Sequence, residues 1–327
     1  MRRREFISLF GSVMAWPLAA RAQPASKMPV VGFLNSASAE LFEKYVGQFR
    51  RGLNEMGFIE GQNVVVEYRW ADGHYERLPE LVSDLVHRKV AVIAATGTPA
   101  ALAAKAATQT IPIVFTTGGD AVALGLVASL AQPGGNVTGT TQLNMALGQK
   151  RLELMHQLLP KATSIAIAVN PANPAVSEVQ AKDAQNAASS LGLQLQILQA
   201  STEAEFETAV ANLPKHSGGL VIGAGDSFFL SATAKFAEIT FRHGVPTIAN
   251  GRDFTAAGGL LSYGGSVADS YHLAGIYTGR ILTGEKPAAL PVLQSSKVEM
   301  YINLKTAKAL GVEVPPGLVI AADEVFE

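Results

Sequence analysis

The residues of this chain with the clearest chemical potential are hydroxyl, amide and acidic side chains that follow predicted buried strands. Some of these loops lead into helices, at Ser38, Thr98 and Asn173. A helix N-terminus offers free backbone N–H groups and a positive dipole end, which favour a carboxylate. The carboxylate of Asp226, on another loop, can accept a hydrogen bond from an ammonium group. Such residues are also ordinary helix caps, so the set carries more weight than any one loop. The loops are residues 35–38, 96–98, 116–120, 170–173, 225–227 and 250–253.

The elements that must position these loops occur twice along the chain. Val30–Asn35 begins an alternation of strands and helices that ends in Ile111–Phe115, and Ile165–Asn170 begins a similar series that ends in Val245–Asn250. Loops after parallel strands open into the functional crevice of such sheets. The repeat therefore predicts an α/β fold with two doubly wound parallel-sheet lobes and a cleft between them.

The chain is long enough for two domains with cores of their own, since it has 327 residues of which 48% are hydrophobic. The segments after the second copy have no place in that copy, so we expect several connections between the lobes. Lobe 1 is predicted to comprise residues 28–143 plus 260–297. Lobe 2 is predicted to comprise residues 144–259 plus 298–327.

No catalytic constellation is evident in the sequence. Gly264–Ala268 resembles the G-x-S-x-G elbow of serine hydrolases, but Ala268 replaces the final glycine, and Ser266 reads more simply as a helix start. The six histidines form no metal-binding pair of the H-E-x-x-H type, and there is no cysteine. These patterns predict a protein that is not an enzyme and has no cofactor and no metal site.

The first 22 residues have the pattern of an export signal. Arg2–Arg4 precede an apolar stretch, and Ala20-Arg21-Ala22 is a typical cleavage site. Arg3-Arg4-Glu5-Phe6-Ile7 resembles the twin-arginine signal, and the general secretory route is the alternative. Without a cysteine no lipid anchor is expected, and the net charge of −1 does not favour a nucleic-acid partner. We expect a periplasmic monomer.

Several short motifs together resemble the ABC-transporter substrate-binding family related to tryptophan/tyrosine-type binding proteins. The resemblance covers essentially the whole chain after residue 22. It implies a type I periplasmic-binding fold with about three crossovers, hinge closure on a small-molecule ligand, and delivery to an ABC permease in the inner membrane. The motifs are Thr98-Pro99-Ala100-Ala101, Ile111-Pro112-Ile113-Val114-Phe115, Gly125-Leu126-Val127, Pro133-Gly134-Gly135-Asn136-Val137-Thr138-Gly139, Asn170-Pro171 and Ile281-Leu282-Thr283-Gly284.

The resemblance points to the same cleft loops for ligand binding. We expect lobe 1 to bind a carboxylate through the hydroxyls of Ser36, Thr98 and Thr117. The side chains expected from lobe 2 are Asn170, Asp226 and Asn250, and Tyr263 is the candidate for packing an apolar or aromatic group. An anion-favouring wall opposite a cation-favouring wall fits a zwitterion. One departure from the family pattern is Asp120-Ala121, where relatives usually have Asp-Pro.

Three functions remain open on this basis. The first is the periplasmic solute-binding component of an ABC importer, which captures a small carboxylate-bearing solute, an amino acid, with aromatic amino acids among the candidates. The second is a sensory ligand-binding protein that presents its closed form to a membrane receptor. The third, an exported α/β hydrolase, lacks the catalytic set that it needs.

Overall fold

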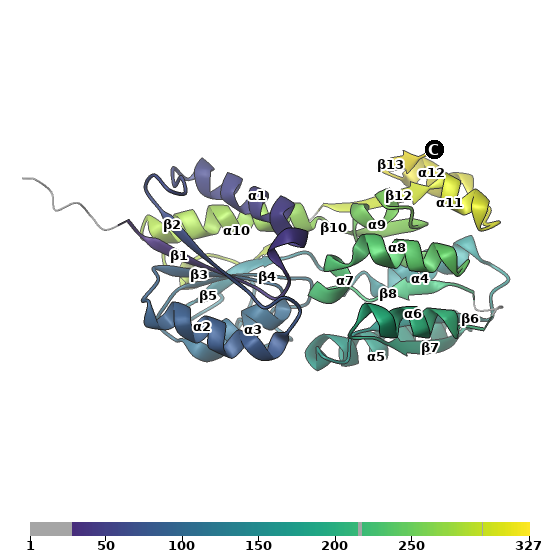
Figure 1. Cartoon of the computed structure of the whole chain (residues 1–327), viewed down its shortest axis with the longest axis horizontal. Coiled ribbons are helices and arrows are strands. Elements are labelled where there is room, and N and C mark those ends of the chain that lie inside the picture. Colours follow the sequence, from purple (N-terminus) through teal and green to yellow (C-terminus); the bar gives the residue numbers. More distant parts are fainter. Residues whose placement is uncertain (1–27, 215–217, 296) are drawn as a thin grey trace, which may run out of the picture.

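The chain folds into two α/β lobes that lie end to end along the long axis of the molecule (Figure 1). The computed structural model describes residues 28–214, 218–295 and 297–327. The predicted export signal therefore lies outside the described residues.

Lobe 1 is built on a six-stranded parallel sheet in the order β11-β5-β4-β3-β1-β2. Helices α1 and α10 cover one face of this sheet, and α2 and α3 cover the other (Figure 1). Every residue of β3 and β4 is buried, as expected for parallel strands covered on both faces. The elements are β1 (Val30–Asn35), α1 (Ala39–Glu55), β2 (Val65–Trp70), α2 (Leu78–His87), β3 (Val92–Thr96), α3 (Thr98–Ala107), β4 (Ile113–Thr117), β5 (Val137–Thr141), α10 (Val267–Leu282) and β11 (Leu293–Gln294).

Lobe 2 is built on a seven-stranded sheet in the order β13-β12-β10-β9-β8-β6-β7. Its strand pairs are parallel except for β10 and β12, which run antiparallel. The elements are α4 (Gly148–Leu158), β6 (Ser164–Val169), α5 (Pro174–Ser190), β7 (Gln194–Gln199), α6 (Glu203–Ala211), β8 (Leu220–Ile222), α7 (Ser227–Ser231), α8 (Thr233–Arg242), β9 (Thr247–Ala249), α9 (Arg252–Ala256), β10 (Leu261–Gly265), β12 (Val298–Asn303), α11 (Leu304–Ala309), α12 (Pro316–Ala321) and β13 (Glu324–Phe326).

The repeat read from the sequence appears as the same strand order in both lobes. The order β4-β3-β1-β2 of lobe 1 matches β9-β8-β6-β7 of lobe 2. The chain crosses between the two sheets after β5, after β10 and after β11. The predicted α/β fold with two doubly wound lobes and about three crossovers is confirmed.

One predicted boundary differs from the structure. Residues 260–265 were expected in lobe 1, but Leu261 and Ser262 of β10 pair with β9, and the whole strand pairs with β12. The physical reason is that an apolar strand next to the second repeat extends the sheet already formed there. The return to lobe 1 begins only after Gly265.

Two glycines allow α1 and α10 to touch backbone to backbone. A Cβ atom on Gly52 would lie 2.0 Å from the carbonyl oxygen of His272, and one on Gly275 would lie 2.1 Å from that of Phe49. No side chain fits at such distances, so this contact fixes α10 on the sheet of lobe 1.

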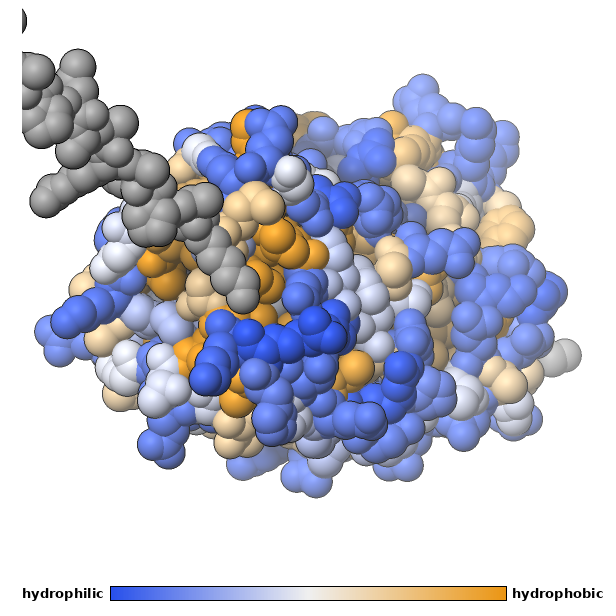
Figure 2. Space-filling view, turned by 60° about the vertical axis from the view of Figure 1, so that its left-hand side comes forward, coloured by the Kyte–Doolittle hydropathy of each residue, from blue (hydrophilic) through white to orange (hydrophobic). Residues whose placement is uncertain are grey.

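The face of the molecule drawn in Figure 2 is mostly hydrophilic. Figure 2 shows hydrophilic residues over most of the face turned to the viewer, with smaller hydrophobic patches between them. In the described part of the chain, exposed large apolar side chains such as Leu41, Val179 and Phe241 lie on separate helices. None of the helices within residues 28–214, 218–295 and 297–327 has the length and apolar character to span a membrane.

The helix contact gives a first prediction. Gly275→Ala should force α1 and α10 apart and lower the free energy of unfolding by about 1–3 kcal/mol, as overpacking does in well-packed cores. Gly47→Ala is the matched control, because it lies on α1 with nothing within 4 Å of the new Cβ atom. That control should stabilise the protein by about 0.5–1 kcal/mol. Urea unfolding measures both changes, and equal stability of the two variants would contradict the packing argument.

Candidate ligand-binding site

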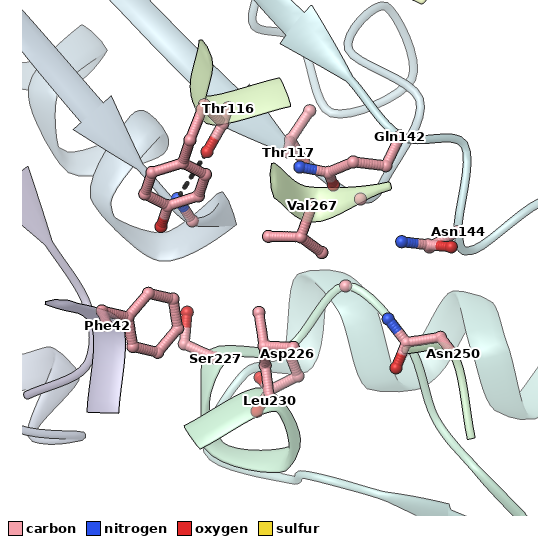
Figure 3. Close-up of a pocket in the computed structure, with 14 residues that line it drawn as sticks. Phe42, Thr116, Thr117, Gln142, Asn144, Asp226, Ser227, Leu230, Asn250 and Val267 are labelled. Atoms are coloured by element: carbon pink, nitrogen blue, oxygen red, sulfur yellow. Dashed lines mark hydrogen bonds between the residues drawn. The ribbon is translucent and has the colours of Figure 1, made fainter. Parts of the chain in front are cut away.

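A cavity lies between the two lobes, where the carboxyl ends of the strands of both sheets meet (Figure 3). Parallel sheets bind their ligands at this edge. The empty space at this site amounts to about 400 Å³, which includes space that is open to solvent. Lobe 1 supplies its lining from the ends of β3, β4 and β5, and lobe 2 from the segments after β8 and β9, while α1, α7 and α10 add apolar side chains. The lining residues are Phe42, Gly97, Thr116, Thr117, Gly118, Gln142, Asn144, Gly225, Asp226, Ser227, Leu230, Asn250, Val267 and Tyr271.

Six of the seven residues predicted from the sequence gather at this cavity. Thr117, Asp226 and Asn250 line it directly. The other three lie immediately behind the lining: the Ser36 hydroxyl accepts from the Ala100 amide at 3.2 Å, Thr98 contacts the Thr117 hydroxyl at 2.7 Å, and Asn170 donates to Asp226 at 3.1 Å.

Tyr263, the seventh predicted residue, does not line the cavity. It lies on β10, and its half-buried ring packs against the hydrophobic core of lobe 2. Its misplacement follows from the boundary error at residues 260–265, because a strand of the second sheet turns this side chain into the lobe 2 core.

Asp226 is the most unusual group in the cavity wall, because its carboxylate is buried and has only neutral hydrogen-bond donors. Asn170 and Asn173 donate from lobe 2 at 3.1 and 2.8 Å, and the Phe228 amide donates at 3.0 Å. Burial raises the pKa of Asp226 above its usual range, and no cation in the described residues offsets this effect. The residue is therefore both the cap of α7 and a buried negative charge without a counter-ion.

Lobe 1 also contributes a donor to Asp226. The Tyr75 hydroxyl lies 3.2 and 3.3 Å from the two carboxylate oxygens. Burial, with the Asp226 charge as the second cause, raises the pKa of Tyr75 well above its usual value, so the phenol stays protonated and donates. The carboxylate thus receives hydrogen bonds from both sides of the cleft.

Further contacts close the cleft around the cavity. Thr98 donates to the Gly225 carbonyl at 3.4 Å, and a Cβ atom on Gly118 would lie 2.6 Å from the Gly225 Cα. At the rim, Asp253 of lobe 2 accepts from Lys44 and, at 3.0 Å, from Tyr45 of lobe 1. These contacts define a closed arrangement of the lobes.

Sequence reasoning missed several residues of the lining. Gln142 and Asn144 follow β5, so the rule that located the other loops would have found them had Val137–Thr141 been recognised as a strand. Phe42, Val267 and Tyr271 lie on helices, where apolar residues read as core, and no local signal sets them apart.

A fully buried arginine supports the cavity from behind. Arg151 on α4 donates to the carbonyl oxygens of Asn144 at 2.5 Å and of Tyr263 at 3.1 Å. Asn144 in turn bonds the backbone of Gly265 through both ends of its amide, at 2.7 and 3.3 Å. Burial lowers the pKa of Arg151 to about 10, a value at which the group stays charged at neutral pH. One side chain of lobe 2 therefore fixes the first two crossovers.

Comparison with known proteins places this geometry in a family. A family model described as ABC transporter substrate binding protein matches residues 30–326. The chain belongs to this family. Its members bind small-molecule substrates and work with an ABC permease.

Relatives with a known ligand or conformation are similar over most of the chain. A tyrosine-binding protein from Clostridioides difficile (strain R20291) is 27% identical over 289 residues, which cover 88% of this chain and 83% of that protein. The ABC domain in complex with L-Trp from Streptococcus pneumonia superposes with a TM-score of 0.82 at 23% identity, over 92% of this chain and 100% of that one. A substrate-binding protein with adhesive properties from Clostridium difficile, in its ligand-free, open structure, gives a TM-score of 0.64 at 27% identity, over 91% of this chain and 99% of that one.

The role of Arg151 gives a second prediction. Arg151→Lys keeps the charge but cannot reach both carbonyls, so it should lower the free energy of unfolding by about 1–3 kcal/mol for the buried acceptor that is left without a donor. Arg280→Lys is the control, because Arg280 forms a partly exposed pair with Glu285. Such a pair contributes at most about 1 kcal/mol. Equal losses in urea unfolding for the two variants would contradict the bridging role.

Proposed function

We propose that this protein is the periplasmic solute-binding component of an ABC importer and captures an amino acid between its lobes by hinge closure. The observation that carries the proposal is the buried carboxylate of Asp226, which lines the cavity without a cation among the described residues. An ammonium group of the ligand supplies the missing positive charge. A charge-assisted hydrogen bond of this kind is stronger than the neutral ones that Asp226 now accepts.

The remaining lining supports an amino acid with an apolar or aromatic side chain. Phe42, Leu230, Val267 and Tyr271 give the cavity an apolar wall, while the polar groups lie on the strand ends. Pockets of this composition take the apolar body of a ligand and orient it with a few polar contacts. The tyrosine-binding relative supports the same ligand class.

Hinge closure is supported by the contacts across the cleft. The Tyr75–Asp226 and Tyr45–Asp253 hydrogen bonds join groups on different lobes, so both break when the lobes separate. The TM-score of 0.64 against the ligand-free, open relative, compared with 0.82 against the L-Trp complex, supports a change in the angle between the lobes. The ligand then acts by stabilising the closed form, which docks on the permease.

A thermal-shift screen tests the function directly. The protein without residues 1–22 is heated alone and with each of the amino acids, with aromatic acids and with sugars. A ligand at 100 times its Kd should stabilise the folded state by about 2.7 kcal/mol. That stabilisation corresponds to a Tm rise of several degrees in a chain of this size. Stabilisation by sugars alone would contradict the amino-acid assignment, and turnover of any compound would contradict a non-enzymatic role.

Asp226→Asn should abolish tight binding of the amino acid found in that screen. Removing one partner of a buried charge pair costs about 2–5 kcal/mol, which corresponds to a loss in affinity of roughly 30-fold to 4,000-fold. Asp72→Asn is the matched control, because Asp72 is exposed and pairs only with Arg77 among the described residues. Isothermal titration calorimetry measures both affinities, and similar values for the two variants would remove Asp226 from the site.

The raised pKa of Asp226 predicts a pH dependence of binding. Only the ionised carboxylate attracts an ammonium group, so affinity should be constant above the raised pKa and fall as the pH drops through it. The fall should begin at a higher pH than the value of about 3.9 of an ordinary aspartate. Calorimetry between pH 4 and 8 measures this profile, and Asp226→Asn should flatten it. An unchanged wild-type affinity down to pH 4 contradicts the assignment.

A further inference from the structure

Two amide side chains of the cavity wall have hydrogen-bonding groups that no described residue uses. Gln142 comes from the first crossover, after β5, and Asn250 follows β9 in lobe 2, so they enter the cavity from opposite sides (Figure 3). Gln142 is only 5% exposed, yet its amide has no hydrogen-bond partner within residues 28–214, 218–295 and 297–327. Neither amide is among the fully enclosed polar atoms of the described residues that lack a partner, so both face the open space of the cavity. Their donors and acceptors are therefore free to bond a ligand.

Of the three hydroxyls expected to bind a carboxylate, Ser36 is fully buried behind the lining, and Thr98 and Thr117 are already engaged. The Thr117 hydroxyl accepts from the Gly119 amide at 3.1 Å and bonds the Thr98 hydroxyl at 2.7 Å. The Thr98 hydroxyl in turn donates a hydrogen bond to the Gly225 carbonyl at 3.4 Å. Each hydroxyl can donate only one hydrogen bond. Because Thr117 then donates to Thr98 and Thr98 donates to Gly225, neither hydroxyl has a hydrogen left for a ligand oxygen.

The apolar side chains of the wall cannot bind a polar group, so the polar end of the ligand that does not contact Asp226 must bind the amides. Each amide NH₂ group offers two donors, and a carboxylate has about four acceptor sites. With the ammonium group at Asp226 and the side chain against Phe42 and Leu230, the group of an amino acid that remains is its carboxylate.

We propose that Gln142 and Asn250 form the subsite that binds the carboxylate of the ligand, in place of the hydroxyls of Ser36, Thr98 and Thr117. This inference rests on the proposed binding of an amino acid. The backbone amide of Gln142 donates to the Thr117 carbonyl of lobe 1 at 3.0 Å, so the carboxylate forms a bridge between lobe 1 and Asn250 of lobe 2. The closed form is then complete only with a ligand that has this group. The two residues also discriminate against amines that lack a carboxylate.

The test combines a charge change in the protein with one in the ligand. Gln142→Glu places a negative charge at the subsite with little change in shape. The variant should bind L-tyrosine about 100-fold or more weakly than the wild-type protein does, because like charges repel strongly in a closed site. L-tyrosinamide has no carboxylate, and the affinity for it should fall by less than about tenfold, since the new glutamate carboxylate accepts hydrogen bonds from its amide. Calorimetry gives both affinities for each protein.

Two further variants separate the possible causes. Gln132→Glu adds the same charge on an exposed loop of lobe 1 and should leave both ligands unchanged. Asn250→Asp should show the same selectivity as Gln142→Glu. Far-UV circular dichroism and the Tm of each ligand-free variant verify that it is folded.

Other results would contradict either the proposed subsite or the proposed function. Equal losses for L-tyrosine and L-tyrosinamide in Gln142→Glu would overturn the subsite while the proposed function stands. A loss specific to L-tyrosine in Thr117→Val, with Gln142→Glu unaffected, would return the carboxylate to the hydroxyls. If neither L-tyrosine nor any other amino acid binds the wild-type protein, the proposed function and the subsite fall together.

Discussion

The closed structure depends on how it accommodates one buried negative charge. Asp226 lies between the lobes without a cation among the described residues, and burying such a charge is unfavourable unless hydrogen bonds compensate it. Asn170, Asn173 and the Phe228 amide donate from its own lobe, and Tyr75 donates from the other. The donor from lobe 1 is present only when the cleft is closed. Closure and the charge of this carboxylate are therefore coupled.

A second buried charge, of opposite sign, holds the hinge. Arg151 binds backbone carbonyls of both the first crossover and β10, which leads into the second, so these segments move as part of lobe 2. Gly265 packs so tightly on the first crossover that a Cβ atom there would lie 2.2 Å from the Gln142 carbonyl oxygen. Lobe 1 in contrast holds α10 through the Gly52–Gly275 contact. In the proposed hinge closure, the bending would fall in the few residues between these two anchored regions, next to the cavity wall.

The sequence was informative wherever a site residue follows a strand of the repeated unit. Thr117, Asp226 and Asn250 were located because parallel strands end at the same edge of a sheet, and that rule needs only the strands. It failed for Gln142. The strand before it, β5, consists of one valine, one glycine and three threonines, and so has no apolar run. It also failed for Tyr263, because the sheet that a strand joins depends on contacts far along the chain. The hydrogen-bond state of Thr98 and Thr117 is a property of three-dimensional distances, and no sequence pattern contains it.

The differences between the two copies of the repeat explain why the cavity favours one orientation of a ligand. Thr98 begins α3 of lobe 1 and Asp226 caps α7 of lobe 2, so each lies at the helix start that follows the third strand of its copy. In this structure the Thr98 hydroxyl donates to the residue preceding Asp226. A symmetric pair would give both walls the same charge and no preference for one orientation of the ligand. Because one copy has a neutral hydroxyl and the other a carboxylate, a zwitterion gains most with its ammonium group toward lobe 2. In the proposed complex its carboxylate is then directed away from Asp226, toward the amides of Gln142 and Asn250, which have no partner in the described part of the chain.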